Sequence, residues 1–208
     1  MHKLALGVVV IAFLVVGCSK KKGDGDHLGT WKKADTQAAL QGAWVGPGLG
    51  NSLNKAAWEV TGDTIKVFDG KAEATYKLEM EAPCKLGLKG ADGTTTYFAI
   101  VMKDGKPLFS GGNAGQRAGD HAVMCAGLQI WSVEKGKCHE KSLSGRWEEN
   151  TKCGFRKNAA GKEEFFWTWM DKQEAAEMEG DYLMPSKDGL ATKVADYAAA
   201  KAALPPKE

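Results

Sequence analysis

Cysteine and histidine are the residues of this chain whose types and spacing could support chemistry. Four cysteines lie within residues 84–153, and two histidines of the same region, His121 and His139, lie close to Cys125 and Cys138. Imidazole nitrogens and thiolate sulfurs are ligands that zinc prefers, so these four residues are a candidate zinc site. The spacing disfavours it, because Cys138 and His139 are adjacent and neighbouring strand side chains point to opposite faces. We therefore expect no metal and no cofactor.

The four cysteines are better explained as two disulfides. An even number of cysteines is typical of a protein exported to an oxidising compartment. Three pairings are open, and we favour Cys84 with Cys125 and Cys138 with Cys153, because each joins segments that are close in the chain. In the chain-entropy model, closing these loops stabilises the fold by about 4 and about 3 kcal/mol.

Candidate catalytic groups are few. Asp120 and His121 are adjacent and could lie near Ser110, but the sequence has no G-x-S-x-G motif, and adjacent strand residues do not form a triad. It also has no H-E-x-x-H, P-loop or dinucleotide-binding motif. A late cluster of glutamates is expected to form a solvated acidic rim: Glu163, Glu164, Glu174, Glu177 and Glu179. The sequence therefore predicts that the protein is not an enzyme.

The densest aromatic segment covers residues 165–169, with the sequence FFWTW. Alternation along a strand places Phe165, Trp167 and Trp169 on one face. Packing in a core is the common role of such side chains, since each ring buries about 150 to 250 Å². The same row could instead stack on the sugar rings of cell-wall polymers or line a cavity. Trp167 and Trp169 are therefore candidate ligand-binding residues.

Residues 110–119, with the sequence SGGNAGQRAG, lack alternation and predict a mobile loop. The segment resembles the glycine- and arginine-containing loop of the membrane-bound bacterial inhibitors of c-type lysozyme, although the tyrosine that follows the arginine there is missing here. In those small β-barrel lipoproteins the loop enters the lysozyme cleft. The resemblance implies an inhibitor of a cell-wall hydrolase and makes Arg117 a candidate binding residue.

The amino terminus has the layout of a signal peptide: residues 1–3 are basic, residues 4–16 carry no charge, and Gly17 and Cys18 follow. The apolar run would reach about 20 Å as a helix, less than the roughly 30 Å that a membrane span crosses. Val15-Val16-Gly17-Cys18 resembles the lipobox of bacterial lipoproteins, whose cysteine accepts diacylglycerol before cleavage. The resemblance implies that residues 1–17 are a cleaved signal peptide and that Cys18 is lipidated; an ordinary secretory signal is the alternative.

Residues 18–37 are polar and contain several lysines and glycines, which is typical of a flexible tether. Acyl chains on Cys18 would hold the protein on the membrane, since each buried CH₂ contributes about 0.8 kcal/mol. By the sorting rule of enteric bacteria, Ser19 after the cysteine indicates the outer membrane. We therefore expect a location in the cell envelope, facing the periplasm.

Composition excludes one class of partner. Residues 1–17 contain a single charged side chain, Lys3, so the remaining chain keeps 27 basic and 26 acidic side chains. A charge balance of this kind lacks the positive field of a nucleic-acid-binding protein. We expect no nucleic-acid partner.

Residues 38–187 are expected to form a β domain. Short runs of β-branched and aromatic residues are separated by turn dipeptides at residues 62–63, 69–70, 92–93 and 104–105. Residues 58–60 and 65–67 predict a hairpin around the first turn. Further strands are expected at residues 76–80, 94–102, 121–126, 128–133, 153–157, 164–170 and 180–184. The fold class is therefore mainly antiparallel β, arranged as a barrel or a sandwich.

Residues 40–44 and 143–147 share the pattern L-x-G-x-W. The first copy resembles the G-x-W of the opening strand of lipocalins, which implies a lipocalin-like barrel closed at one end by Trp44. If the second copy is a true repeat, a smaller β unit begins near residue 143; a single domain is the simpler arrangement.

Residues 188–208 are expected to form a short helix and a tail. The helix is predicted over residues 190–203, because this stretch is alanine-rich, follows Asp188-Gly189 and is stopped by Pro205-Pro206. Its apolar face is expected to pack on the barrel.

The function expected from these features is non-catalytic binding in the cell envelope. The candidate partners are a small apolar ligand, a glycan or an envelope protein, besides the membrane that holds the lipid. An inhibitor of a cell-wall hydrolase and a purely structural envelope protein are the alternatives. This expectation depends on analogy between folds.

Overall fold

The computed structural model describes residues 33–49, 54–169, 171–187 and 189–205. The expected signal peptide, the expected lipidation site Cys18 and most of the expected tether therefore lie outside the described residues. Among the described residues, no helix has the length and apolar character needed to cross a membrane.

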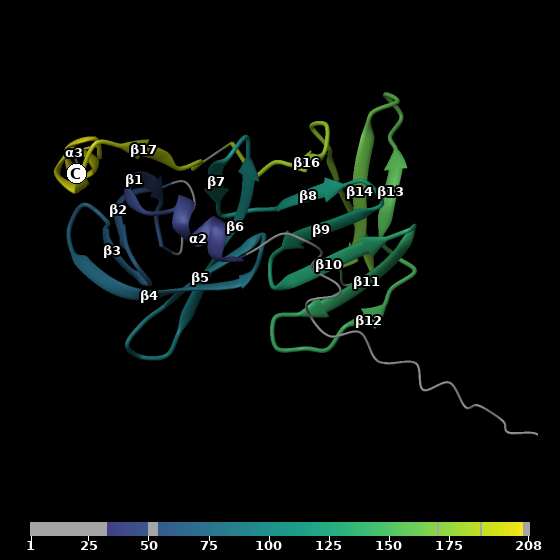
Figure 1. Cartoon of the computed structure of the whole chain (residues 1–208), viewed down its shortest axis with the longest axis horizontal. Helices are drawn as coiled ribbons and strands as arrows, with labels where there is room; N and C mark the ends of the chain where they lie inside the picture. The colour runs from purple at the N-terminus through teal and green to yellow at the C-terminus, as the bar shows by residue number, and fades with distance from the viewer. Residues whose placement is uncertain (1–32, 50–53, 170, 188, 206–208) are drawn as a thin grey trace, which may run out of the picture.

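The described chain is mainly antiparallel β, with three sheets and short helices (Figure 1). The strands of the first sheet are β1 (Gly42–Pro47), β2 (Lys55–Thr61), β3 (Thr64–Phe68), β4 (Glu73–Ala82), β5 (Lys85–Lys89), β6 (Thr95–Lys103), β7 (Lys106–Ser110) and β17 (Thr192–Val194). They follow the order β17-β1-β2-β3-β4-β5-β6-β7. The sheet curls on itself, and we call this part of the molecule the half-barrel lobe.

The inside of the half-barrel lobe is a packed aromatic and aliphatic core. Trp58 packs edge-on against Phe98, with ring centroids 5.0 Å apart, and lies 5.0 Å from the ring of Phe109. Leu86 and Ile65 are fully buried in the same cluster. The predicted hairpin is confirmed, since β2 pairs with β3 around the turn at residues 62–63. The helix α2 (Lys33–Ala39) lies across the mouth of this lobe and contacts both β4 and β7.

The second part of the molecule holds the two smaller sheets, and we call it the two-sheet lobe. Six strands form one sheet: β8 (Ala114–Ala118), β9 (His121–Ala126), β10 (Gln129–Glu134), β11 (Lys137–Ser142), β12 (Glu148–Glu149) and β16 (Tyr182–Leu183). The other sheet has β13 (Gly154–Lys157), β14 (Glu163–Trp169) and β15 (Lys172–Glu177). Trp131 of the larger sheet packs against Phe165 and Trp167 of the smaller one, which joins the sheets through a shared core.

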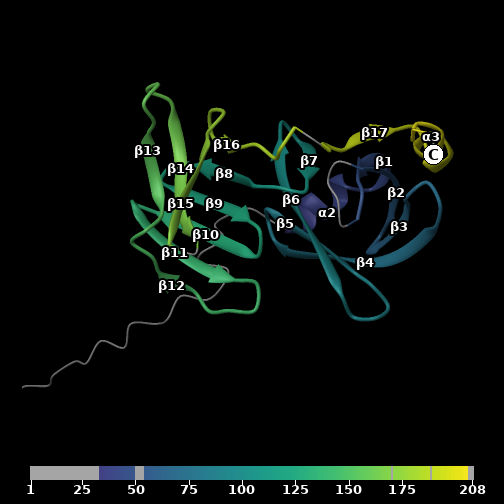
Figure 2. The ribbon, with the colours of Figure 1, turned by 180° about the vertical axis from the view of Figure 1, so that it is seen from behind.

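The outer face of β6 joins the two lobes. Ala99 and Val101 of β6 are fully buried in a cluster with Ala114, where Tyr182 and Met184 also pack. The disulfide Cys84–Cys125 connects the β4–β5 turn of the half-barrel lobe to β9 of the two-sheet lobe. Seen from behind, the lobes lie side by side, with the chain crossing from β7 to β8 and returning after β16 (Figure 2).

Four sequence expectations need correction. Residues 33–37, assigned to the tether, belong to α2. Most of the loop expected at 110–119 is the strand β8, because β8 pairs with β9 on one side and β16 on the other. The helix expected at 190–203 is only α3 (Tyr197–Ala202), since residues 192–194 pair with β1 as β17. The second β unit begins at residue 114 rather than near 143, because β8 is its first strand.

Candidate functional site

An apolar hollow lined by described residues lies at the seam of the half-barrel lobe. The strands β7 and β17 are the two edges of the same curled sheet, and they face each other across a groove of about 710 Å³. Volumes of about 300 to 1,000 Å³ are typical of small-molecule pockets. We call this hollow the seam groove; its lining residues are Ala38, Ala39, Gln41, Trp44, Gly105, Lys106, Pro107, Leu108, Ala191, Thr192 and Lys193.

One end of the seam groove is closed by backbone contacts. The N–H of Ala191 donates to the carbonyl oxygen of Phe109 at 3.1 Å, which joins the C-terminal segment to β7. The ammonium of Lys55 donates to the carbonyl oxygen of Leu190 at 3.2 Å. A Cβ on Gly46 would lie 3.5 Å from both Ala191 and Phe109, so these two side chains pack over the strand at this residue. Beyond this closed end the two edge strands are not paired with each other.

Trp44 forms the floor of the seam groove. Its indole is 3% exposed, and its Nε1–H donates to the carbonyl oxygen of Leu40 at 2.8 Å. It packs edge-on against Phe109 at 5.5 Å, and the ammonium of Lys193 lies 5.4 Å from its ring centroid. A tryptophan fixed on several sides gives the groove a rigid apolar floor.

The helix α2 forms the wall of the seam groove nearest the amino terminus. Its last residues on this side are the small Ala38 and Ala39. Gln41 holds the end of the helix in place, because its side chain donates to the carbonyl oxygen of Gly62 at 3.0 Å and accepts the N–H of Gly62 at 2.7 Å. The position of the wall is therefore set by contacts with the β2–β3 turn.

The charged side chains that line the seam groove are both basic. Lys106 and Lys193 are on opposite edge strands, and neither forms an ion pair with a carboxylate in the part of the chain that the structure describes. The lining includes no aspartate or glutamate. The groove therefore combines apolar walls with two cations.

The expected aromatic candidates do not lie at this groove. Trp167 is 6% exposed and packs in the core of the two-sheet lobe, 5.5 Å from Trp131 and 5.8 Å from Phe165. Its role in this structure is that of a core residue. For Trp169 the structure gives the backbone pairing with Lys172, and its side chain lies outside the described residues.

Arg117 lies in the strand β8 and connects the sheets of the two-sheet lobe. Its Nη1 donates to Glu163 at 2.7 Å, its Nε donates to Asp181 at 3.2 Å, and its guanidinium lies 5.2 Å from the ring of Phe155. Desolvation lowers the pKa of Arg117, but the hydrogen bonds to Glu163 and Asp181 outweigh it and raise the pKa above its ordinary value. Because Arg117 lies in a paired strand and is held by two carboxylates, the segment does not form the protruding loop that the lysozyme-inhibitor resemblance requires.

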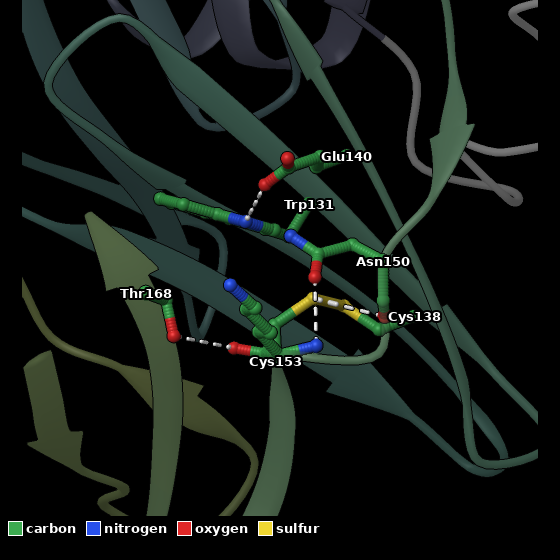
Figure 3. The surroundings of a disulfide bond; sticks show 7 residues. Trp131, Cys138, Glu140, Asn150, Cys153 and Thr168 are labelled. Atoms are coloured by element: carbon green, nitrogen blue, oxygen red, sulfur yellow. Dashed lines mark hydrogen bonds between the residues drawn. A yellow bond between two sulfur atoms is a disulfide. The ribbon is translucent and has the colours of Figure 1, made fainter. Parts of the chain in front are cut away.

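Both expected disulfides are confirmed, with the pairing Cys84–Cys125 and Cys138–Cys153. Figure 3 shows Cys138–Cys153 beside Trp131, whose Nε1–H donates to Glu140 at 3.1 Å, and to the right of Thr168, whose hydroxyl donates to the carbonyl oxygen of Lys152 at 3.3 Å. Because Cys125 and Cys138 belong to different disulfides, they are not available as zinc ligands beside the histidines.

The histidines contact a serine that the sequence did not single out. Nε2 of His121 lies 3.2 Å from the hydroxyl of Ser132, and His139 is the register partner of Ser132 on β11. Ser132 is fully buried, so its hydroxyl is enclosed in the sheet.

Four glutamates of the late cluster form ion pairs: Glu163 with Arg117, Glu164 with Arg156, Glu177 with Lys162 and Glu179 with Lys103.

Apart from Trp44, no sequence pattern indicates the seam groove. Its walls come from α2, β7 and β17, and two of these elements were expected to be a tether and a helix. A residue pattern that identifies each edge strand by itself does not show that the two edges meet.

Comparison with known proteins adds no relative: no protein-family model, no curated protein and no solved structure matches this chain.

Proposed function

We propose that the protein is a lipoprotein of the bacterial cell envelope, anchored through Cys18, that binds a small apolar ligand in the seam groove without catalysis. The two disulfides indicate an oxidising compartment outside the cytoplasm, which supports this location. Ser19 after the lipidated cysteine favours the outer membrane, with the domain facing the periplasm.

The observation that carries the proposal is the apolar lining of the seam groove. Trp44, Pro107 and Leu108 are the large apolar residues of the lining, and Ala38 and Ala39 of α2 add small apolar side chains to it. Pockets for small molecules combine apolar walls with a few placed polar groups in this way. The burial of Trp167 removes the main support for a glycan ligand, because its ring is not free to stack on a sugar.

The proposed anchor sets an upper limit on the distance between Cys18 and the groove. Cys18 precedes the start of α2 by 15 residues, and a chain of that length spans at most about 50 Å. A ligand taken from the membrane or from the adjacent periplasm would therefore be within reach of the groove.

The experiment that tests this function measures the binding of N-phenyl-1-naphthylamine, an uncharged probe that fluoresces in apolar sites. We expect saturable binding to the wild type and a loss of at least about tenfold in affinity for Ala39→Trp, because the indole would fill the groove beside Trp44. Ala202→Trp, at an exposed position on α3, is the matched control. Equal binding of the probe to the wild type and to Ala39→Trp would place the site elsewhere and refute the proposal.

A further inference from the structure

We infer that the ligand of the seam groove is an amphiphile with an apolar chain and an anionic head group, bound by Lys106 and Lys193. This inference rests on the function proposed above and adds the chemical class of the ligand. It comes from the distribution of charge along the groove, which the proposed function does not use.

The two lysines lie away from the closed end of the groove. That end is marked by the hydrogen bond between Ala191 and the carbonyl oxygen of Phe109. Along their strands, Lys193 follows Ala191 by two residues and Lys106 precedes Phe109 by three, so their Cα atoms lie about 7 and about 10 Å from those of the closing pair. Both lysines therefore come from the parts of the edge strands that lie beyond the closing hydrogen bond, where the two edges are not paired.

Neither cation forms an ion pair with a carboxylate of residues 33–49, 54–169, 171–187 or 189–205. Asp104 belongs to the same turn as Gly105 but does not line the groove. The neighbouring Lys103 is instead directed to Glu179, with its ammonium 3.7 Å from the carboxylate. An anionic head group is the ligand feature that complements two such lysines, because an uncharged head group would leave both without a counter-charge.

Lys193 is positioned for this role by its surroundings. Its ammonium lies 5.4 Å from the ring centroid of Trp44, and its Cε would lie 3.3 Å from a Cβ on Gly42. The absence of a side chain at Gly42 thus lets the lysine lie along the groove floor. A cation over the indole that forms the floor places charge directly beside the apolar chain of a bound amphiphile.

A peptide strand is a less suitable occupant of the gap between the edges. Pro107 has no backbone N–H, so β7 lacks one of the donors that an added strand would use. The opposite edge, β17, has only three residues. Edges of this kind are typical of strands that avoid pairing with other chains.

The test is the displacement of bound N-phenyl-1-naphthylamine by four twelve-carbon amphiphiles below their micelle concentrations: dodecanoate, dodecyl phosphate, dodecanol and dodecyltrimethylammonium. We expect the two anions to compete about tenfold better than dodecanol, and the cation to compete worst. The comparison of dodecanoate with dodecyl phosphate distinguishes a carboxylate head group from a phosphate head group.

The matched variants are Lys106→Gln/Lys193→Gln and, as a control, Lys89→Gln/Lys137→Gln, whose lysines are exposed elsewhere. In the first variant we expect the advantage of the anions to fall below about threefold, with probe and dodecanol binding unchanged; the control keeps the wild-type pattern. The inference fails if the probe binds but anions and dodecanol compete equally in the wild type, or if the advantage survives in the first variant. If the probe binds neither the wild type nor either double variant, the result refutes the proposed function instead.

Discussion

Lys85 is a buried lysine at the contact between the two lobes. It is 2% exposed and forms no ion pair with any described residue. Its register partner Ala99 also pairs with Ser110, so the three residues form a row on the outer face of the curled sheet. The hydroxyl of Ser110 is buried without a hydrogen-bond partner among the described residues. Two polar groups are thus enclosed where the lobes meet.

Replacing Lys85 by methionine is expected to stabilise the protein at neutral pH. Burial lowers the pKa of Lys85 from its ordinary value of 10.5 to about 8, so the folded state opposes protonation below pH 8. This cost is complete below about pH 8 and disappears as the pH rises to about 10.5, where the unfolded chain also loses the proton. We expect Lys85→Met to raise the free energy of unfolding by about 2 to 3 kcal/mol at pH 7, measured by urea denaturation.

The control for this prediction is Lys89→Met, an exposed lysine on the same strand, which should leave the stability near that of the wild type. The difference between Lys85→Met and the wild type should shrink between pH 8 and pH 10. A difference that stays constant over this range, or a destabilised variant at pH 7, would contradict the assignment of the cost to desolvation.

Gly115 explains why a glycine-rich segment is a strand. A Cβ at this position would overlap the sulfur of Met124 and lie 2.7 Å from the carbonyl oxygen of Val123. The glycine therefore lets β8 approach β9 closely. We expect Gly115→Ala to lower the free energy of unfolding by about 2 kcal/mol or more, whereas Ala118→Ser at the exposed end of the same strand should change it by less than about 0.5 kcal/mol. Denaturant unfolding of both variants measures the free energy of unfolding. If Gly115→Ala leaves that free energy unchanged, residues 110–119 are better described as the loop that the sequence predicted.

At the scale of elements, the sequence predicted the strands whose signals are local. The turn at residues 104–105 has Asp104 at φ 52° and Gly105 at φ 72°, which is the conformation that an aspartate–glycine pair favours in hairpins. The strand predicted at 121–126 is β9 with the same bounds. Alternation of apolar residues and a turn dipeptide were sufficient here because both partners of the hairpin are neighbours in the chain.

The elements that the sequence missed depend on distant partners. The alanine-rich segment after residue 190 favours a helix by itself, yet Thr192–Val194 pair with Val45, Trp44 and Ala43 of β1. The pairing partner lies near the other end of the described chain, so no local pattern indicates it. The seam groove was missed for the same reason, because it exists only when β17 has paired with β1 and faces β7.

At the scale of the whole molecule, the two disulfides have different roles. Cys138–Cys153 joins segments of the two-sheet lobe, whereas Cys84–Cys125 crosses from one lobe to the other. The buried cluster around Cys84–Cys125 contains Ala82 from the half-barrel lobe and Val123 and Ile130 from the two-sheet lobe. The crossing disulfide therefore couples the unfolding of the lobes.

Removing the crossing disulfide is expected to separate the unfolding of the two lobes. We expect Cys84→Ala/Cys125→Ala to unfold in two transitions, with a loss of up to about 4 kcal/mol of stability. Cys138→Ala/Cys153→Ala should keep the lobes coupled and lose about 3 kcal/mol. Circular dichroism and tryptophan fluorescence followed during guanidinium unfolding report the transitions. Coincident curves for the first variant would show that the contact between lobes is sufficient without the disulfide.

The pairing of β17 with β1 also sets a time order for a chain that is exported from its amino terminus. During export β1 can pair with β2 at once, but its other edge stays open until the last part of the chain has crossed the membrane. The unfinished half-barrel lobe, with one edge of β1 still open, is thus the form most exposed to aggregation. Under the proposed export and ligand binding, the seam groove forms only after the last part of the chain has crossed the membrane, so uptake of the ligand follows release from the export machinery.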